Sequence, residues 1–306
     1  MLLLIEQLLN GLQFGIMLFL LAAGLTLIFG IMGVINLAHG SLYMLGAFVA
    51  AAVINWSGSF LVGAAVALPA AALAGIAVEV VVIRRLYARD HLDQVLATFG
   101  LILFANEAVA MVWGRPPQFV RVPPFLDGAV EIVPGVPYPV YRLAIIAVGL
   151  AVAVGLWLLI QRTRIGMLIR AGATHREMVA ALGVDIRLLY TAVFGLGALL
   201  AGLAGVMAGP LFSVQVGMGE QILILTFVVI VIGGLGSIRG ALAGALLVGL
   251  TDTLGRSFLK SGLALVLPPS AADGIGAALA SMLIYLLMAV VLVLRPRGLF
   301  PAMGGR

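Results

Sequence analysis

An uncharged polar stretch interrupts the apolar sequence near the N-terminus, over residues 30–46. It carries the amide of Asn36, the imidazole of His39 and the hydroxyl of Ser41, with glycines at 30, 33, 40 and 46. Such side chains can hydrogen bond to backbone groups that an interrupted helix leaves free, and the glycines permit tight turns. A single histidine does not make a metal site. Two roles stay open for His39: a hydrogen-bonded helix cap, or a group beside a polar path through the protein.

The sequence lacks the motifs of the common catalytic sites. It contains no cysteine, and neither H-E-x-x-H nor G-x-S-x-G occurs in it. Because the one lysine, Lys260, follows Leu259, there is no phosphate-binding G-x-x-x-x-G-K-[ST] loop. The histidines at 39, 91 and 175 lie far apart on segments of different kinds. We therefore predict no catalytic residue and no metal site, so that any ATP hydrolysis must come from another chain.

The longest internal polar segment covers residues 161–189. Within it, Thr174 and Glu177 have the spacing of a capping box, in which each side chain binds a free backbone N–H group. Gly183 fits the matching helix end. The pattern predicts a short helix over 175–182, which requires a surface to lie on because so short a helix is marginal in water. This helix could be a docking site for another protein or a simple connector, and the spacing favours neither role.

Acidic residues within apolar runs are candidates for a functional path. Glu107, beside Asn106, and Asp252 are two of them. Glu79 lies five residues before Arg84 at the cytoplasmic boundary, which favours either an ion pair between them or a Glu79 side chain that extends to the membrane surface. Three such acids are few for a carrier that is driven by protons or sodium ions.

The composition places these residues in a membrane protein. Of 306 residues, 63% are hydrophobic and 9% charged, whereas about 25% are charged in an ordinary soluble domain. We predict an all-α polytopic membrane helical bundle of eight or nine spans, with an interrupted helix near 30–46. Glu6 stands where a signal peptide carries positive charge, so we expect the first span to be retained. The predicted spans are 8–29, 41–56, 60–83, 94–113, 142–160, 190–209, 221–236, 239–255 and 277–294.

Basic residues indicate which loops face the cytoplasm. If 84–89 lies inside, then 161–189, 237–238 and the C-terminus lie inside as well, and an odd number of spans puts the N-terminus outside. The inside then holds twelve arginines and the outside five basic residues. The net charge of +5 therefore reports orientation and not nucleic-acid binding. The loops on the outer side are 114–141, 210–220 and 256–276.

The outer segment 114–141 holds seven of the thirteen prolines, which predicts a stiff, extended loop without a long helix. It could contact an external partner or close over the bundle. Two ladders of small residues, Gly197 to Gly209 and Gly236 to Gly244, recur every four positions and predict close helix contact, within the chain or with a second copy.

Residues 24–50 closely resemble the permease subunits of branched-chain amino-acid ABC transporters, the LivH type. The most specific part is the G-x-x-N-x-A-H-G segment that contains Asn36 and His39. The resemblance continues through Leu96-Ala-Thr98-Phe-Gly100, the segment from Arg170 to Asp185, Gly233-Gly-Leu-Gly236-Ser-Ile and the terminal Arg295-Pro-Arg297-Gly-Leu-Phe300. It spans nearly the whole chain, which it identifies as a single transmembrane permease domain over 1–306.

The resemblance implies one subunit of an importer in the bacterial plasma (inner) membrane. Its partners are a second, LivM-like permease, two cytoplasmic ATPase subunits that hold ATP and Mg, and a periplasmic or extracellular solute-binding protein. This chain itself needs no cofactor. Permeases for urea, short-chain amides and aromatic compounds have similar sequences, so the solute stays open among these classes. A carrier or channel that works alone is the remaining alternative.

Six residues are candidates to line the solute path or support the broken helix. Asn36, His39 and Ser41 cluster in the uncharged stretch, and Asn106 and Glu107 lie within the fourth apolar run. Thr98 belongs to a segment that carries the resemblance, which also implies a role for the polar segment 161–189. Importers of this class carry a cytoplasmic coupling helix with the pattern E-A-A-x-x-x-G. Glu177 and Gly183 keep that spacing, although Met178 and Val179 replace the two alanines. Residues 161–189 then form the coupling segment, and Arg170, Thr174, Glu177 and Gly183 are its candidate ATPase contacts.

Overall fold

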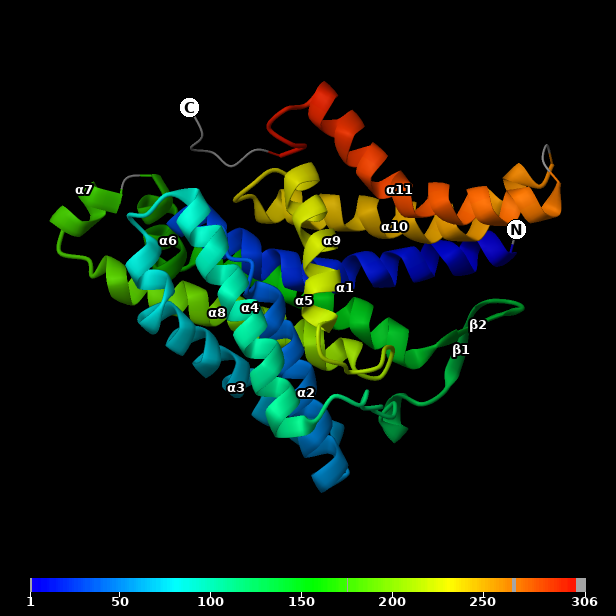
Figure 1. Cartoon of the computed structure of the whole chain (residues 1–306), viewed down its shortest axis with the longest axis horizontal. Helices are drawn as coiled ribbons and strands as arrows, with labels where there is room; N and C mark the ends of the chain where they lie inside the picture. The colour runs from blue at the N-terminus through cyan, green and yellow to red at the C-terminus, as the bar shows by residue number, and fades with distance from the viewer. Residues whose placement is uncertain (1, 175, 266–267, 301–306) are drawn as a thin grey trace.

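The computed structural model describes residues 2–174, 176–265 and 268–300. Eight of its helices are long and apolar enough to cross a membrane, which confirms the predicted all-α polytopic bundle. Figure 1 shows their arrangement. They are α1 (Leu2–Met32), α2 (His39–Ser57), α3 (Phe60–Val81), α4 (His91–Trp113), α5 (Val140–Arg162), α8 (Ile186–Ala208), α10 (Ile238–Leu263) and α11 (Pro269–Leu294).

The predicted span 221–236 is a shorter helix, α9 (Met218–Gly233), which has 16 residues. At 1.5 Å per residue it is about 24 Å long, less than the hydrocarbon thickness of about 30 Å. The remaining elements are short: η1 (Ile83–Leu86), η2 (Pro124–Leu126), α6 (Arg164–Thr174) and α7 (Arg176–Ala181), with the strands β1 (Ala129–Val133) and β2 (Val136–Pro139).

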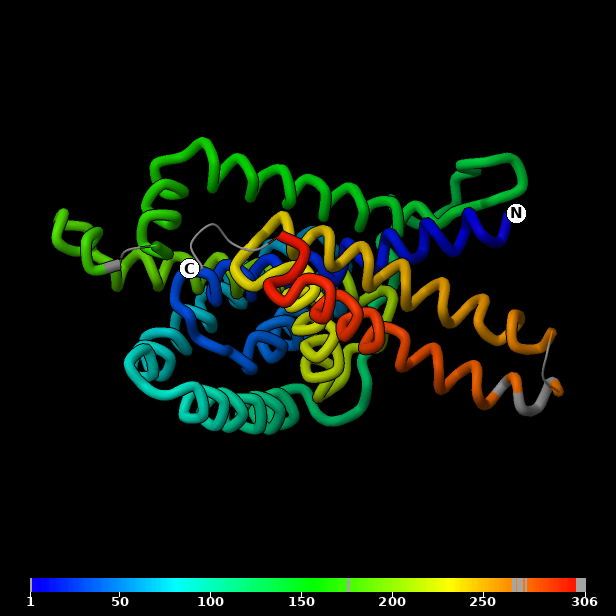
Figure 2. The backbone as a smooth tube through the Cα atoms, turned by 90° about the horizontal axis from the view of Figure 1, so that it is seen from above, coloured from blue at the N-terminus to red at the C-terminus, as the bar shows by residue number. Residues whose placement is uncertain are grey.

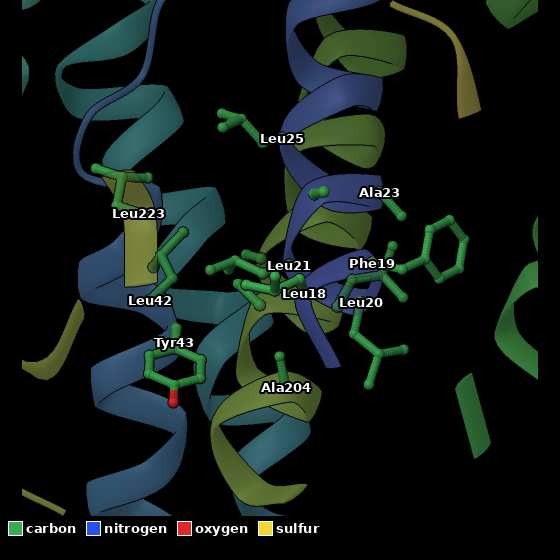
Figure 3. Close-up of a cluster of buried hydrophobic side chains, with 14 of the residues drawn as sticks. Leu18, Phe19, Leu20, Leu21, Ala23, Leu25, Leu42, Tyr43, Ala204 and Leu223 are labelled. Carbon is green, nitrogen blue, oxygen red and sulfur yellow. The ribbon is translucent and has the colours of Figure 1, made fainter. Parts of the chain in front are cut away.

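Helix α1 forms the centre of the bundle, where every residue from Gly15 to Ile28 is buried. Its sequence is apolar on all faces, as a helix surrounded by protein requires. It contacts α5, α8, α9 and α10. In Figure 3 its side chains Leu18 and Leu21 lie near Leu42 and Tyr43 of α2 and Ala204 of α8.

Glycines let the central helices approach backbone to backbone. A Cβ at Gly249 of α10 would lie 2.4 Å from the Gly15 nitrogen of α1, and a Cβ at Gly24 would lie 2.6 Å from the Gly197 carbonyl oxygen of α8. Both predicted ladders contain such contacts, since Gly240 of α10 meets Gly233 of α9 in the same way. The small residues therefore serve packing within this chain.

The segments between helices gather at two ends of the bundle. At one end, Tyr190 of α8 donates to the Ile31 carbonyl of α1, and the C-terminal segment joins α9 because Leu299 N donates to the Ile232 carbonyl. At the other end, residues 114–139 are bridged to the α8–α9 loop by the pair Gln118 and Val214. This grouping agrees with the predicted alternation of loops, whereas the side of the membrane on which each end lies stays a prediction.

The proline-rich segment is extended, as expected, but it also folds into an antiparallel hairpin of β1 and β2 that the sequence analysis did not predict. The hairpin lies beside the N-terminal end of α1 (Figure 2). Its Tyr138 ring is 1% exposed, and burial raises the pKa of the Tyr138 hydroxyl.

Candidate functional site

The predicted break in the first helix is present. Helix α1 ends at Met32, and Gly33 takes a positive φ of 67° while its N–H donates to the Phe29 carbonyl. The chain then runs without helical structure to Ala38, and α2 begins at His39. Only glycine adopts this backbone conformation without strain, so Gly33 ends the helix and turns the chain back into the bundle.

Asn36 holds the turn that precedes α2. Its Oδ1 accepts a hydrogen bond of 3.0 Å from the Ala38 N–H, and its side chain is fully buried. The Nδ2 group of Asn36 has no partner among the described residues. Ser41 follows in the first turn of α2, where its N–H donates to the Ala38 carbonyl and its side chain is half-buried.

His39 lies deep inside the bundle. Its Nε2 is 3.3 Å from the Leu21 carbonyl oxygen of α1, and the residue is fully buried. Leu21 lies eleven residues before the end of α1, which is about 16 Å along the helix axis. The break is therefore not a surface loop. Because a carbonyl oxygen only accepts, Nε2 carries the proton in this contact, and Nδ1 is left without a partner in the described structure.

Gln94 of α4 supports the same segment, although the sequence analysis missed it. Its Oε1 accepts from the Ile35 N–H at 3.3 Å, and its Nε2 donates to the carbonyls of Leu86 and Arg89, each at 3.2 Å. The hydroxyl of Thr98, four residues later on the same face, donates to the Gln94 carbonyl at 2.7 Å. The sequence feature that could have revealed Gln94 is its position four residues before Thr98, which places two polar side chains on one face of an otherwise apolar helix.

Asn106 and Glu107 lie elsewhere. They are twelve and thirteen residues beyond Gln94, about 18 Å along α4. Asn106 donates to the Glu220 carboxylate at the start of α9. Glu107 is exposed and forms an ion pair of 2.9 Å with Arg115. The structure does not bring these two residues to the break, and their place in a solute path stays a prediction.

The predicted ion pair between Glu79 and Arg84 is confirmed, at 2.9 Å. It belongs to a larger cluster, since Glu79 also accepts hydrogen bonds from Tyr87 and from Thr191 of α8. Burial and the Glu79 carboxylate raise the pKa of the Tyr87 hydroxyl, which keeps it protonated as a donor. Asp252 likewise pairs with Arg256, one turn further along α10.

The segment 161–189 contains two helices. The first, α6, was not predicted; it turns sharply after α5, buries Ile169 and two glycines, and leaves Arg170 exposed. The second, α7, falls within the predicted range 175–182, of which residue 175 lies outside the described residues. Gly183 ends α7 as predicted, with a φ of 84°.

The predicted capping box at Thr174 is wrong. Thr174 is the last residue of α6, and its hydroxyl donates to the Arg170 carbonyl one turn earlier. A helix N-cap residue has non-helical backbone angles, whereas Thr174 is still part of α6, so the two-residue match was accidental. Glu177 is exposed on α7, next to the exposed Met178, and Leu182 is 79% exposed. These side chains present a mixed polar and apolar surface.

The described residues contain no group of three histidine, aspartate or glutamate side chains that could hold a metal ion. The arrangement is a membrane bundle in which two buried polar side chains, Asn36 and His39, lie where α1 gives way to α2, with a short exposed helix, α7, at one end. These features define a multi-pass membrane protein.

Comparison with known proteins identifies its family. The model of the family described as branched-chain amino acid transport system / permease component matches residues 7–292. The chain belongs to this family, which confirms the resemblance of residues 24–50. No solved structure matches the chain.

Three known permease proteins are similar to the chain over most of its length. The chain is 30% identical to the high-affinity branched-chain amino acid transport system permease protein BraD of Pseudomonas aeruginosa, over 96% of this chain and 95% of that protein. It is 28% identical to the corresponding permease protein LivH of Escherichia coli K12, over 84% and 87%. It is also 29% identical to the ribose import permease protein RbsC of Escherichia coli K12, over 81% and 74%.

Proposed function

We propose that this chain is the membrane-spanning permease subunit of an ATP-driven importer of leucine, isoleucine and valine. The observation that carries the proposal is the break of residues 33–38 between α1 and α2, where Asn36 and the adjoining His39 are fully buried inside an apolar bundle that belongs to this permease family. Polar backbone is tolerated at membrane depth only where protein surrounds it or where it borders a cavity. Aliphatic solutes suit the apolar surroundings of the break.

Asn36, His39 and Ser41 stabilise this break in the proposed function. The known hydrogen bonds of Asn36 and His39 both go to backbone groups of the chain itself, to Ala38 and Leu21. They support a structural role for the two side chains, whose Asn36 Nδ2 and His39 Nδ1 atoms are buried without a partner among the described residues. Gln94 and Thr98 extend this support from α4.

The ATPase partners dock on α7 in this proposal. Glu177, Met178 and Leu182 are exposed there, and Gly183 fixes the turn that leads into α8. A helix of six residues has little stability of its own, which fits a segment that a partner completes. ATP and Mg are held by two cytoplasmic ATPase subunits, and the chain described here supplies no catalytic group.

The orientation follows from charge. We place the end that carries α6, α7 and the C-terminal segment in the cytoplasm, because twelve arginines belong to the loops assigned to that side. The hairpin of β1 and β2 and the N-terminus then face the outside of the bacterial inner membrane, where a solute-binding protein delivers its cargo. A second, LivM-like permease completes the membrane part.

Purification from the native membrane tests this function. The tagged chain, in mild detergent, should bring two P-loop ATPases and a second permease in stoichiometric amounts, and the preparation should hydrolyse ATP. Liposomes that contain this complex should accumulate radiolabelled leucine when ATP and the binding protein are supplied. A pure chain that moves solute without an ATPase would replace the proposal with a carrier or channel.

The similarity to a ribose permease makes a sugar the second candidate solute. The liposome assay therefore includes ribose, together with urea and a short-chain amide, each at the same concentration as leucine. Uptake of one of these with no uptake of leucine, isoleucine or valine would keep the importer architecture and overturn the assigned solute.

A further inference from the structure

Glu79 is a buried carboxylate near the end of α3 where three segments of the chain meet. It is fully buried, and it accepts hydrogen bonds from Arg84 Nε at 3.2 Å, Arg84 Nη2 at 2.9 Å and the Tyr87 hydroxyl at 2.6 Å. These donors lie in and just after η1. Hydrogen bonds to an ionised carboxylate are about twice as strong as those between neutral groups, so the cluster is stiff.

The fourth donor to Glu79 comes from a distant part of the chain. The Thr191 hydroxyl of α8 lies 2.7 Å from Glu79 Oε2 and also 2.9 Å from the Arg187 carbonyl of its own helix. The single hydroxyl proton is better placed on the carboxylate, because the charged acceptor is stronger. Arg84 Nη2 in turn donates to the Thr191 oxygen at 2.7 Å. The hydrogen bonds of Thr191 with Glu79 and Arg84 thus connect α8 to both α3 and η1.

The cluster continues to the end of α1. The Tyr87 and Tyr190 rings are in edge-to-face contact, with centroids 5.3 Å apart, and the Tyr190 hydroxyl donates to the Ile31 carbonyl at 3.4 Å. Ile31 lies two residues before Gly33, where the broken segment begins. A displacement at Thr191 is therefore passed to the first residues of the break through packed rings and hydrogen bonds.

The same turns of α8 follow directly from the exposed α7. Asp185 caps α8, since its Oδ1 accepts from the N–H groups of Arg187 and Leu188 at 2.9 and 3.2 Å. Two residues separate Gly183, which ends α7, from the start of α8. Tyr190 and Thr191 thus lie in the second turn of a helix whose capped first turn follows α7 after a short connection.

We propose that Glu79 is a positioning residue for transport: it locks the first turns of α8 to α3, η1 and the end of α1, so that movement of α7 displaces the broken segment. This proposal rests on the proposed importer function, in which α7 receives the motion of the ATPases. Without the lock, α8 slides against α3, and ATP is hydrolysed with little solute moved.

The test measures solute accumulated per ATP hydrolysed by the assembled complex in liposomes. Thr191→Val removes the hydroxyl at nearly constant shape and leaves the ion pair of Glu79 and Arg84 intact, whereas Thr191→Ser keeps the hydroxyl. Because a hydrogen bond to a charged group corresponds to roughly a tenfold change in an equilibrium, we expect Thr191→Val and Glu79→Gln to lower the ratio about tenfold. Thr191→Ser should retain the ratio within about twofold of the unmodified complex.

Tyr141→Phe is the matched control. The buried Tyr141 hydroxyl joins α5 to the other end of α8 through the Met207 carbonyl, at 2.9 Å. Its loss removes one interhelical hydrogen bond without touching the Glu79 cluster, and should leave the ratio unchanged. Size-exclusion chromatography of each variant measures the amount of assembled complex, so that loss of assembly is not counted as loss of coupling.

The outcomes separate the two proposals. An unmodified complex that takes up no solute with ATP overturns the importer function itself. Coupled uptake by the unmodified complex, with an unchanged ratio in Thr191→Val, overturns the role of Glu79, and so does an equal loss in Tyr141→Phe. If Glu79→Gln does not assemble, the contrast between Thr191→Val and Thr191→Ser decides the question alone.

Discussion

Replacement of Asn36 by alanine tests whether this side chain holds the break in the first helix. The change removes the acceptor of the Ala38 N–H, and Ala38 is 5% exposed, so water cannot replace it freely. A buried donor without a partner costs about 1–3 kcal/mol. The unpaired Nδ2 of Asn36 disappears at the same time, which offsets part of that cost. We expect a net loss of about 1–2 kcal/mol in the free energy of unfolding.

The assay is thermal unfolding of the purified chain in detergent, followed by intrinsic fluorescence. A loss of that size lowers the melting temperature by about 2–8 °C, at 2–4 °C per kcal/mol in a large domain. Asn36→Ser, which keeps an oxygen two residues before the Ala38 N–H, should recover part of the loss. Ser59→Ala is the control, because Ser59 accepts from the Val62 N–H in the same manner at an exposed helix start.

Water replaces the exposed acceptor at Ser59, so that control should cost less than about 1 kcal/mol. The reasoning is refuted if Asn36→Ala unfolds at the temperature of the unmodified chain, or if it is no worse than Ser59→Ala. It is also refuted if Asn36→Ser and Asn36→Ala are equally unstable, because the oxygen acceptor would then have no role.

Three further predictions, one with a control substitution, follow from other contacts in the structure. Thr26→Val should raise the unfolding free energy by about 1 kcal/mol in the same thermal assay, because it removes a buried hydroxyl that has no partner among the described residues; a loss of stability would contradict this. Gly249→Ala should cost about 1–3 kcal/mol, since its Cβ would lie 2.4 Å from the Gly15 nitrogen. Gly155→Ala, where a Cβ meets nothing within 4 Å, should be neutral or stabilising, and equal effects at the two glycines would reject the packing argument. Gly183→Pro removes the N–H that donates to the Ala180 carbonyl, and proline cannot adopt the positive φ of 84°. ATP hydrolysis should then continue without solute uptake. Unchanged uptake per ATP would exclude α7 as the docking helix.

Much of the architecture could be predicted because its causes are local. An uninterrupted apolar run of about 20 residues has one stable conformation in a lipid bilayer, which is the helix. Eight of the nine predicted spans are therefore confirmed as helices long enough to cross a membrane. The break at Gly33 was visible as a polar, glycine-rich stretch, and the ion pair of Glu79 and Arg84 as two opposite charges five residues apart. Gly183 was recognised because a helix end there needs a residue that tolerates positive φ.

Other features depend on contacts that no local pattern encodes. Gln94 and Thr191 are ordinary polar residues in their own helices, and they matter only because folding places them against Ile35 and Glu79, 59 and 112 residues away. The capping box at Thr174 failed for the opposite reason: a local pattern matched, but α6 continued through it.

The sequence by itself determined the class of the protein, the position of its spans and the location of its two unusual segments, because hydrophobic length, charge and glycine act within a few residues. The tertiary structure decided what those segments touch. It placed His39 about 16 Å from the end of α1, and it joined the start of α8 to the broken segment through Glu79. These relations arise because glycines on α1, α8 and α10 let helices distant in sequence pack backbone against backbone, which brings a few buried polar groups within hydrogen-bond distance.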